Sequence, residues 1–477
     1  MLGAGIAGLV AAYELERLGY AVEILEAGSR LGGRIHTHRF GSGSQVPYVE
    51  LGAMRVPAEH HHTLHYIDEL GLTGRLRRFE TLLSNEENYL ATGMGHLRRR
   101  DASPVIIEEF QKKFADHRYS DSTILFGAWL STLANAISPT VFRANLDDAI
   151  NHELLGLIEG IDLTPYLRGG TDVRVDLHTF FSDHTHLRNG SSGRLARFLH
   201  DIINETSPEL VRLEGGMDQM VHRLANRIRG PIKFGQEVID IDLREDHALL
   251  HVREGGHVIV HRRDRVLCTL PFSVLRRFRL PGFSTEKKRI ISEITYWSAT
   301  KVAVHCREAF WEGEGITGGA SFGGGRIRQM FYPPKGENTP AGAVLLASYT
   351  MGGDADVLGR MPIEERHTVV LEEAAAIHPQ LRTPGMVRGV VSAVWGQDPL
   401  SQGAGVTRWG KDTRECERER QLASAPEGCV HFAGEHCSST PAWVDGAIES
   451  AVHAVRTLSG HTVGVTPATS GLREGMR

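Results

Sequence analysis

A glycine-rich turn stands at the start of the chain, in the order Gly3-Ala-Gly5-Ile-Ala-Gly8, and an acidic residue, Glu26, ends the next strand-like run. Glycines at this spacing let the backbone turn sharply and bring the N–H groups of a helix N-terminus close to a phosphate. A carboxylate at the end of the following strand can accept hydrogen bonds from both hydroxyls of a ribose. Together the two features predict a dinucleotide site.

Further anchors favour an extended flavin dinucleotide over a nicotinamide. The chain continues with Gly28-Ser-Arg-Leu-Gly32-Gly33-Arg34, turns again at Gly52, and carries Gly434-Glu435 near its other end. Arg34 can offer a fixed cation to a pyrophosphate, and Glu435 can accept a hydrogen bond from a ribityl or phosphate-proximal group. These anchors indicate FAD.

Arg55 directly follows the second glycine turn, in Gly52-Ala-Met-Arg55. A planar guanidinium can grip a carboxylate through two parallel hydrogen bonds and so fix its orientation. The alternative is a surface arginine. The apolar residues on both sides of Arg55 favour a buried position over an exposed one. The position therefore predicts a substrate that bears a carboxylate.

Lys301 interrupts an apolar, strand-like stretch, Thr300-Lys-Val-Ala-Val304. A charge in such a stretch needs a partner or a wet cavity, unless the side chain reaches solvent from an edge strand. Both interpretations are open from the residues alone.

The composition is that of an ordinary globular protein, with 477 residues, 23% charged and 41% hydrophobic residues, and a net charge of -5. This balance favours neither nucleic acid nor a membrane as a partner, and no apolar run approaches the length of a spanning helix. Five scattered cysteines suit a reducing, cytoplasmic compartment. We expect no metal, because the adjacent histidines His60, His61 and His62 point in different directions and no acid or cysteine completes a ligand set.

Only Met1 and Leu2 precede the first glycine turn, whereas a parallel strand normally runs for about 5 residues. We expect that the natural chain starts further upstream. An export signal would have been lost with that segment, so secretion stays open beside the cytoplasmic expectation.

Hydrophobic periodicity predicts the order of the elements. A helix is expected at 6–18 and a strand at 21–25, and helical patterns such as 66–70 and 145–159 dominate 59–210, with few strand-like runs. Strands are then expected at 236–243, 248–252, 258–260, 265–270, 300–305 and 343–350, and helices at 360–377 and 446–458. The chain is too long for one simple core.

In their order and distances these motifs resemble the flavin amine oxidase superfamily, and within it the L-amino acid oxidases. The resemblance is carried by the 3–8 turn with Glu26, Gly32-Gly33-Arg34, Glu50-Leu-Gly-Ala-Met-Arg55, Gly215-Gly-Met-Asp218, Lys301, and Gly434-Glu435 with Trp443-Val-Asp-Gly-Ala-Ile448. It implies an α/β fold in which a Rossmann-like FAD-binding domain (1–57, 211–290, 425–458) is combined with an α+β substrate-binding domain (58–100, 291–424). A helical insertion domain (101–210) and a flexible tail (459–477) complete the expected organisation.

The same resemblance implies the residues of the site. Those expected at the FAD are Gly3, Gly5, Ile6, Ala7, Gly8, Glu26, Ala27, Gly33, Arg34, Gly52, Ala53, Met54, Arg55, Val238, Gly434, Glu435, Ala442, Trp443, Val444, Asp445, Gly446 and Ala447. Those expected at the substrate are Arg55, Tyr349, Met351, Ala442 and Trp443. Arg55 and Tyr349 would hold the carboxylate, Trp443 would form a wall beside the flavin, and Lys301 would hold a water next to flavin N5, so that these four residues form the expected catalytic group.

Monoamine oxidases carry covalent flavin on a cysteine shortly before the terminal motif, and the corresponding stretch here, 395–403, has no cysteine. We therefore expect non-covalent, dissociable FAD. Dimers are common in similar enzymes, so a homodimer is expected.

The predicted reaction is oxidative deamination of L-amino acids. The α-amine must be neutral while the α-hydride moves to the flavin, and desolvation in an apolar pocket favours that form. The imino acid then hydrolyses to a 2-oxo acid and ammonia, and oxygen is reduced to hydrogen peroxide. Three alternatives stay open: an L-amino acid 2-monooxygenase that yields an amide, an oxidase of amines lacking a carboxylate, and a flavin-binding protein without turnover.

Overall fold

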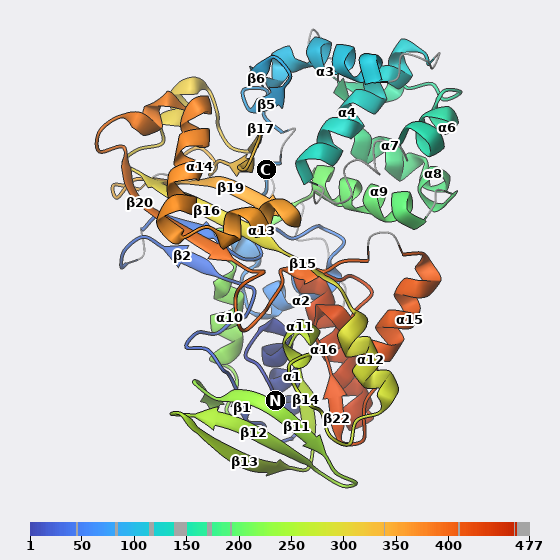
Figure 1. Cartoon of the computed structure of the whole chain (residues 1–477), viewed down its shortest axis with the longest axis vertical. Coiled ribbons are helices and arrows are strands. Elements are labelled where there is room, and N and C mark those ends of the chain that lie inside the picture. Colours follow the sequence, from blue (N-terminus) through green and yellow to red (C-terminus); the bar gives the residue numbers. More distant parts are fainter. Residues whose placement is uncertain are drawn as a thin grey trace.

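The protein has three parts, which Figure 1 shows in one view: a parallel sheet with its helices, a large mixed sheet and a helical lobe. The computed structural model describes residues 1–43, 46–81, 84–113, 119–137, 150–168, 174–190, 193–337, 339–408, 411–461 and 463–464. The expected tail after residue 464 lies outside the described residues.

A parallel sheet carries the glycine-rich turn. Its strands are β1 (Ile24–Leu25), β10 (Ile232–Lys233), β14 (Val266–Cys268) and β22 (Val430–Phe432). Leu2 bridges β1 and β14 in parallel, so the spatial order is β10, β1, Leu2, β14, β22. The first strand is therefore represented by Leu2, whose N–H donates to the Leu267 carbonyl at 3.0 Å.

Each face of this sheet is covered by a different layer. Along the strands alternate side chains point to opposite faces. Ile24 and Leu267 therefore join the core formed with helices α1 (Ile6–Arg17), α10 (Asp218–Ala225) and α16 (Val444–Ser459). Leu25 and Cys268 pack on the other side against an antiparallel meander, seen at the bottom of Figure 1. The meander strands are β11 (Glu237–Leu243), β12 (Ala248–Glu254) and β13 (His257–Arg263).

The second part is a seven-stranded sheet in the order β20, β16, β19, β18, β17, β5, β6. Its strands are β5 (Tyr89–Thr92), β6 (Gly95–Arg98), β16 (Ala299–Cys306), β17 (Ala320–Gly324), β18 (Arg328–Phe331), β19 (Ala343–Met351) and β20 (Val387–Val394). One face packs against helices α13 (Gly353–Arg360) and α14 (Ile363–Ile377). The opposite face, which carries Lys301 and Tyr349, packs toward the helical lobe.

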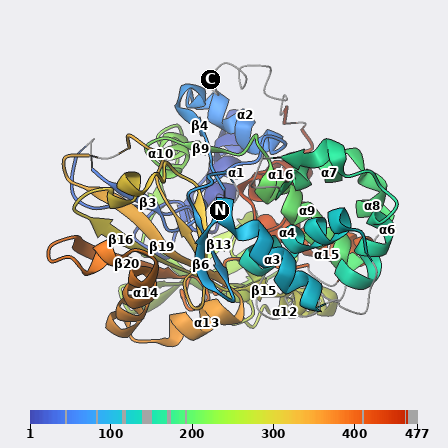
Figure 2. The same cartoon turned by 90° about the horizontal axis from the view of Figure 1, so that it is seen from above.

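The helical lobe lies beside the large sheet, as the view from above shows (Figure 2). Its described elements are α3 (Arg99–Lys113), α4 (Asp121–Ile137), η2 (Ile150–Leu155), α6 (Gly156–Ile158), η3 (Thr164–Tyr166), β7 (Leu167–Arg168), β8 (Arg174–Val175), α7 (Leu177–Asp183), α8 (Thr185–Gly190) and α9 (Gly193–Thr206). Trp129, Phe126 and Phe180 are fully buried at its centre. The expected helix at 145–159 begins outside the described residues, and its described part is helical as far as Ile158.

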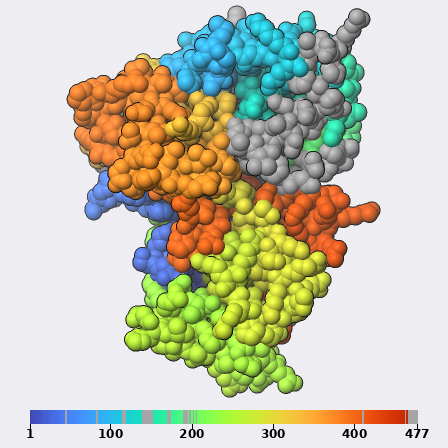
Figure 3. Space-filling view, in the orientation of Figure 1, coloured from blue at the N-terminus to red at the C-terminus, as the bar shows by residue number. Residues whose placement is uncertain are grey.

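Short elements connect the three parts. They are β2 (Thr37–Arg39), β3 (Tyr48–Glu50), α2 (His61–Glu69), η1 (Thr73–Arg75), β4 (Leu76–Arg78), β9 (Val211–Leu213), α11 (Phe272–Leu275), α12 (Thr285–Glu293), β15 (Tyr296–Trp297), η4 (Phe310–Glu314), η5 (Pro379–Arg382), β21 (Gly405–Val406), α15 (Thr413–Ser424) and η6 (Glu435–Cys437). In the space-filling view the helical lobe and the large sheet form the upper half, and the meander lies at the bottom (Figure 3). None of the helices in the described part of the chain combines the length and hydrophobicity needed to cross a membrane.

The structure differs from the sequence expectation mainly at β5 and β6. This hairpin lies within 59–210, where few strands were expected, and it extends the large sheet because Leu90 pairs in parallel with Phe322 of β17. Its residues have no strict alternation of apolar and polar side chains, so the pairing partner and not the local pattern determines the strand.

Candidate functional site

A cavity of about 410 Å³ runs between the parallel sheet and the large sheet. Most of the residues expected at the cofactor and substrate line it. They are Gly3, Gly5, Ile6, Ala7, Glu26, Ala27, Gly33, Arg34, Gly52, Ala53, Val238, Lys301, Tyr349, Gly434, Glu435, Ala442, Trp443, Val444 and Ala447. The chain thus brings residues from both of its ends and its middle to one elongated space.

Six expected residues do not line this cavity: Gly8, Met54, Arg55, Met351, Asp445 and Gly446. Gly8 and Gly446 serve close packing instead, because an added Cβ would lie 2.1 Å from the Gly3 carbonyl oxygen and 2.0 Å from the Thr440 carbonyl oxygen, respectively. Met351 is half-buried at the end of β19 and packs against the core of the helical lobe.

Asp445 links helix α16 to helix α2. Its carboxylate accepts hydrogen bonds from the Thr63 backbone N–H at 2.8 Å and the Thr63 hydroxyl at 3.0 Å. Burial alone would raise the pKa of Asp445, but the nearby His62 and these donors lower it. The acid therefore fixes the start of α16, whose first residues Val444 and Ala447 face the cavity.

The N-terminus of α1 opens into the cavity next to an acid. Gly3 has φ +93°, a conformation that favours glycine, and this turn directs the first turn of α1 toward the space. The Glu26 carboxylate at the end of β1 accepts the N–H groups of Ala4 and Gly28, both at 2.7 Å. An ionised carboxylate can accept further hydrogen bonds, so Glu26 retains capacity toward a ligand hydroxyl.

Arg34 and Glu435 form an ion pair in the wall of the cavity, with Nη1 and Oε1 2.8 Å apart. Burial alone would lower the pKa of Arg34 and raise that of Glu435, but each charge stabilises the other, so the pKa of Arg34 rises and that of Glu435 falls. Oε2 of Glu435 also accepts the Ala442 N–H at 2.8 Å. Glu435 thus orients Arg34 and the turn before Trp443. The sequence predicted only a contact between Glu435 and the ligand.

Lys301 lies on β16, between β19 and β20, and only 3% of it is exposed. This position rules out a side chain that reaches solvent from an edge strand. Its Nζ donates to the carbonyl oxygens of Gly52 at 2.7 Å and Glu50 at 3.1 Å. Burial, together with the charge of Arg55, lowers the pKa of Lys301 to about 7.

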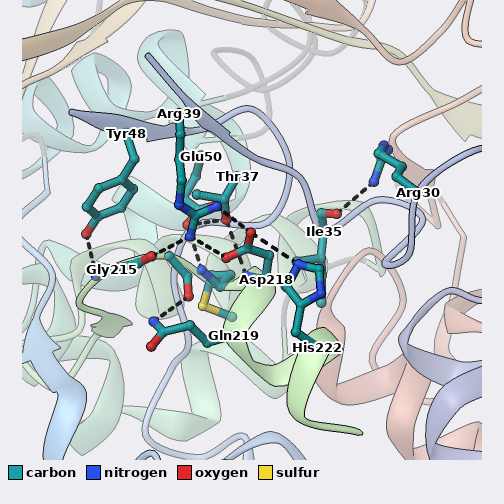
Figure 4. Close-up of polar contacts among 12 residues, drawn as sticks. Arg30, Ile35, Thr37, Arg39, Tyr48, Glu50, Gly215, Asp218, Gln219 and His222 are labelled. Atoms are coloured by element: carbon teal, nitrogen blue, oxygen red, sulfur yellow. Dashed lines mark hydrogen bonds and ion pairs between the residues drawn. The ribbon is translucent and has the colours of Figure 1, made fainter. Parts of the chain in front are cut away.

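The carbonyl of Glu50 accepts from this lysine, and its carboxylate belongs to a polar cluster formed by β2, β3 and the start of α10. Figure 4 shows this cluster. The Glu50 carboxylate accepts the Thr37 hydroxyl at 2.9 Å and the Met217 N–H at 2.7 Å, and burial raises its pKa to about 7. Arg39 holds the neighbouring Asp218 with two hydrogen bonds, at 2.6 and 2.9 Å. The motif 215–218 therefore binds the Glu50 carboxylate of β3 at the start of α10.

Tyr349 and Arg55 lie close to Lys301. Tyr349 pairs directly with Lys301 across β16 and β19, and the Lys301 Nζ is 4.7 Å from the centre of the tyrosine ring. The Arg55 guanidinium lies over the Phe79 ring at 5.6 Å. The geometry thus places a phenol in the cavity wall beside the lysine, and the Arg55 charge acts on the same lysine from outside the residues that line the cavity.

Trp443 forms another part of the wall. It contacts His60 edge to face, with ring centroids 4.9 Å apart, and precedes the first residue of α16. Burial lowers the pKa of His60 to about 4, so this neighbour is a neutral ring at ordinary pH. A neutral imidazole edge holds the indole plane without placing a charge beside the cavity.

Sequence reasoning missed Trp297, Trp395 and Asp398, which also line the cavity. The Trp395 indole N–H donates to the Leu51 carbonyl at 2.7 Å and so ties this loop to the Gly52 turn. None of the three belongs to a motif with a local signature. Of the three, only Trp395 is a buried aromatic residue in a polar loop, and that feature alone could have indicated it.

The residues of the cavity fit FAD. A helix N-terminus and the Arg34 cation suit a pyrophosphate, Glu26 suits a ribose, and the wall near Trp443, Lys301 and Tyr349 suits a flat ring system. The turn at Gly52 must remain glycine, because an added Cβ would lie 2.1 Å from the Arg34 carbonyl oxygen.

Comparisons with known proteins agree with this geometry. Residues 6–459 match the family described as flavin containing amine oxidoreductase. A flavin-dependent L-tryptophan oxidase (RebO) of Lentzea aerocolonigenes is 57% identical over 458 residues, which cover 96% of this chain and 97% of the relative. An L-amino-acid oxidase of Vipera ammodytes ammodytes is 26% identical over 472 residues, covering 96% and 92% of the two chains.

Among solved structures, a putrescine oxidase bound to putrescine superposes with a TM-score of 0.62 at 17% identity, covering 96% of this chain and 98% of that one. This likeness supports the fold, in which an FAD-binding Rossmann-like domain is joined to a substrate-binding domain, as expected from the sequence. The family match and the relatives show that the cofactor of this chain is FAD and that the chain is an oxidoreductase. The chain belongs to the flavin-containing amine oxidoreductase family.

Proposed function

We propose that this protein is an FAD-dependent oxidase of L-amino acids that acts on L-tryptophan or a closely related aromatic amino acid. The oxidative deamination is supported by the L-amino acid oxidases that match nearly the whole chain. The preference for an indole side chain is supported by the 57% identity to an L-tryptophan oxidase. The observation that carries the proposal is the presence of Lys301, Tyr349 and Trp443 in the lining of one cavity that also fits FAD.

We assign to Arg55 and Tyr349 the binding of the substrate carboxylate. A guanidinium and a phenol can each donate to a carboxylate, and the guanidinium adds the charge that an amine without a carboxylate would not need. The apolar wall at Ala299, Ala442 and Trp443 disfavours the charged form of the substrate amine by desolvation. FAD, when bound, accepts the hydride of the α-carbon and passes its electrons to oxygen.

Lys301 is assigned a proton-handling role through its lone pair. A neutral amine has two N–H donors, and the carbonyl oxygens of Glu50 and Gly52 accept both. The remaining direction of the amine faces the Met54 Sδ at 3.4 Å, so a water or a proton reaches the lone pair when this flexible side chain moves aside. The pKa of about 7 lets Lys301 gain or lose that proton near neutral pH.

The test is a hydrogen peroxide assay with the twenty L-amino acids and their D-enantiomers as controls. We expect the highest turnover with L-tryptophan and none with D-tryptophan. Equal turnover on small aliphatic and aromatic L-amino acids would contradict the aromatic preference. Peroxide from tryptamine at a similar rate would contradict the carboxylate contact, because tryptamine keeps the indole and the amine only.

Mass spectrometry of the product separates the oxidase from a 2-monooxygenase, since a 2-oxo acid and an amide differ in mass. A flavin-binding protein without turnover would keep its yellow colour when mixed anaerobically with L-tryptophan. We expect bleaching instead, which reports transfer of electrons to the flavin.

A homodimer and a cytoplasmic location are part of the proposal. The dimer is supported by its frequency among similar enzymes, and the location by the absence of disulfides among the five cysteines. Light scattering of the purified holoenzyme and cell fractionation are the respective measurements.

A further inference from the structure

A second cavity, of about 110 Å³, lies along the same face of the large sheet as Lys301 and Tyr349. Leu346 lines it and pairs with Ala303, two residues from Lys301, so the two side chains share a face. The buried part of its lining is mostly apolar and includes Val49, Met54, Leu213, Phe331, Val344 and Leu346, together with Tyr332. The rim includes the partly exposed residues Glu80, Pro334 and Glu337. The space thus leads from the protein surface toward the lysine.

The Met54 side chain joins the lining of this cavity to that of the main one. Met54 lines the second cavity, and its Sδ lies 3.4 Å from the Nζ of Lys301, which lines the main cavity. A methionine side chain is unbranched and flexible, so it can move aside at low cost. The two spaces can therefore connect without movement of the backbone.

The lining of the second cavity favours a small apolar molecule. Apolar cavities hold water poorly and take up small apolar molecules such as xenon. An amino acid zwitterion carries two charges that would need partners. Most of the buried lining is apolar, and the charged lining residues Glu50 and Arg212 are already engaged, Glu50 by Thr37 and Met217 and Arg212 by Glu337. Among the reactants of the proposed oxidase, only dioxygen is small, uncharged and apolar.

We propose that the second cavity is the route by which dioxygen reaches the main cavity, with the Met54 side chain as the gate beside Lys301. The inference rests on the proposed oxidase function. Dioxygen takes two electrons from the reduced FAD and two protons, and leaves as hydrogen peroxide. The route brings dioxygen to the lysine side of the main cavity.

A separate route has a kinetic consequence. Dioxygen can arrive while the imino acid still fills the main cavity, so reoxidation does not wait for product release. The rate of reoxidation should therefore depend on the second cavity, whereas the rate of reduction by substrate should not.

The experiment uses Leu346→Phe, which fills the second cavity from its buried wall. Leu345→Phe is the matched control, because Leu345 is also fully buried but belongs to the core on the opposite face of β19. Each holoenzyme is reduced anaerobically with L-tryptophan and then mixed rapidly with oxygenated buffer. For Leu346→Phe we expect the second-order reoxidation constant to fall about tenfold, equivalent to about 1.4 kcal/mol in the barrier. The reduction constant should stay as in the wild type, and Leu345→Phe should change neither.

An unchanged reoxidation constant in a folded, FAD-loaded Leu346→Phe would overturn the route. Slower reduction with unchanged reoxidation would assign the cavity to the substrate side chain and also overturn it. Crystals of the wild-type holoenzyme under xenon pressure give an independent measurement, in which a xenon peak between Val344 and Leu346 is expected and its absence counts against the proposal. A wild type that no L-amino acid reduces would instead show that the proposed oxidase function is wrong.

Discussion

Replacing Lys301 by methionine should make the fold more stable at neutral pH while impairing catalysis. Burial lowers the lysine pKa from 10.5 to about 7. That change corresponds to about 5 kcal/mol of unfavourable free energy for the charged form in the folded protein. Lys301→Met removes this cost. It also leaves the carbonyl groups of Glu50 and Gly52 without their donor, which costs about 1 to 1.5 kcal/mol each. The net gain at pH 7 is about 2 kcal/mol.

The gain should disappear as the pH rises. Between pH 7 and about 10.5 the unfolded chain keeps the lysine proton and the folded chain has lost it, so the wild type becomes more stable with increasing pH. The advantage of Lys301→Met therefore falls by about 1.4 kcal/mol per pH unit in this window. By about pH 10 the lost hydrogen bonds dominate and the variant is the less stable protein.

The assay is urea unfolding of FAD-saturated wild type and Lys301→Met at several pH values from neutral to about 10, with peroxide production measured in parallel. Lys287→Met is the matched control. Lys287 is also buried, donates to the carbonyl oxygens of Leu422, Ala423 and Ala425, and has a pKa lowered by burial to about 8, but it does not line the main cavity. Its variant should keep normal turnover. A stability difference for Lys301→Met that does not change with pH would refute the reasoning.

Three further outcomes are expected. Arg55→Ala should retain FAD but raise the apparent Michaelis constant for the amino acid, because losing a charged partner costs about 2 kcal/mol or more, roughly thirtyfold; unaltered steady-state constants would discard the carboxylate role. Glu435→Gln leaves the Arg34 charge in a buried wall without its counter-charge. The flavin absorbance per protein after gel filtration should therefore fall. Glu449→Gln, on the exposed side of α16, is the control and should leave this absorbance unchanged. Precipitation with trichloroacetic acid should leave a yellow supernatant, and a yellow pellet would indicate a covalent flavin.

Much of the cofactor site could be predicted because its signals are local. The turn at Gly3 and the acid at Glu26 are separated by one helix and one strand, and their roles follow from backbone geometry that a short segment fixes by itself. Glu435 was also expected at the cofactor, from the Gly434-Glu435 motif near the other end of the chain. Its observed partners, Arg34 and the Ala442 N–H, could not be predicted in the same way, because the ion pair joins residues far apart in the sequence.

The substrate side of the cavity was less predictable for the same physical reason. Whether Lys301 is buried depends on the strands on either side of it, and both β19 and β20 follow much later in the chain. Trp395 enters the wall through a hydrogen bond to the Leu51 carbonyl, which no local pattern specifies. The hairpin β5–β6 has weak strand preference and forms because β17 offers it an edge.

Strand β3 shows how a short segment can hold several parts of the site in register. Its alternation directs Tyr48 toward the Gly215 N–H and Glu50 toward the Met217 N–H, while Val49 on the opposite side joins the apolar core of the large sheet. The Glu50 carbonyl is left to accept from Lys301. A slip of one residue in the pairing of β2 and β3 would reverse every one of these directions. It would place a carboxylate in the apolar core and a valine against the start of α10, and the lysine would lose the carbonyl that fixes its amine. The cost of burying that carboxylate without a partner is what keeps the register, and with it the position of Lys301, well defined.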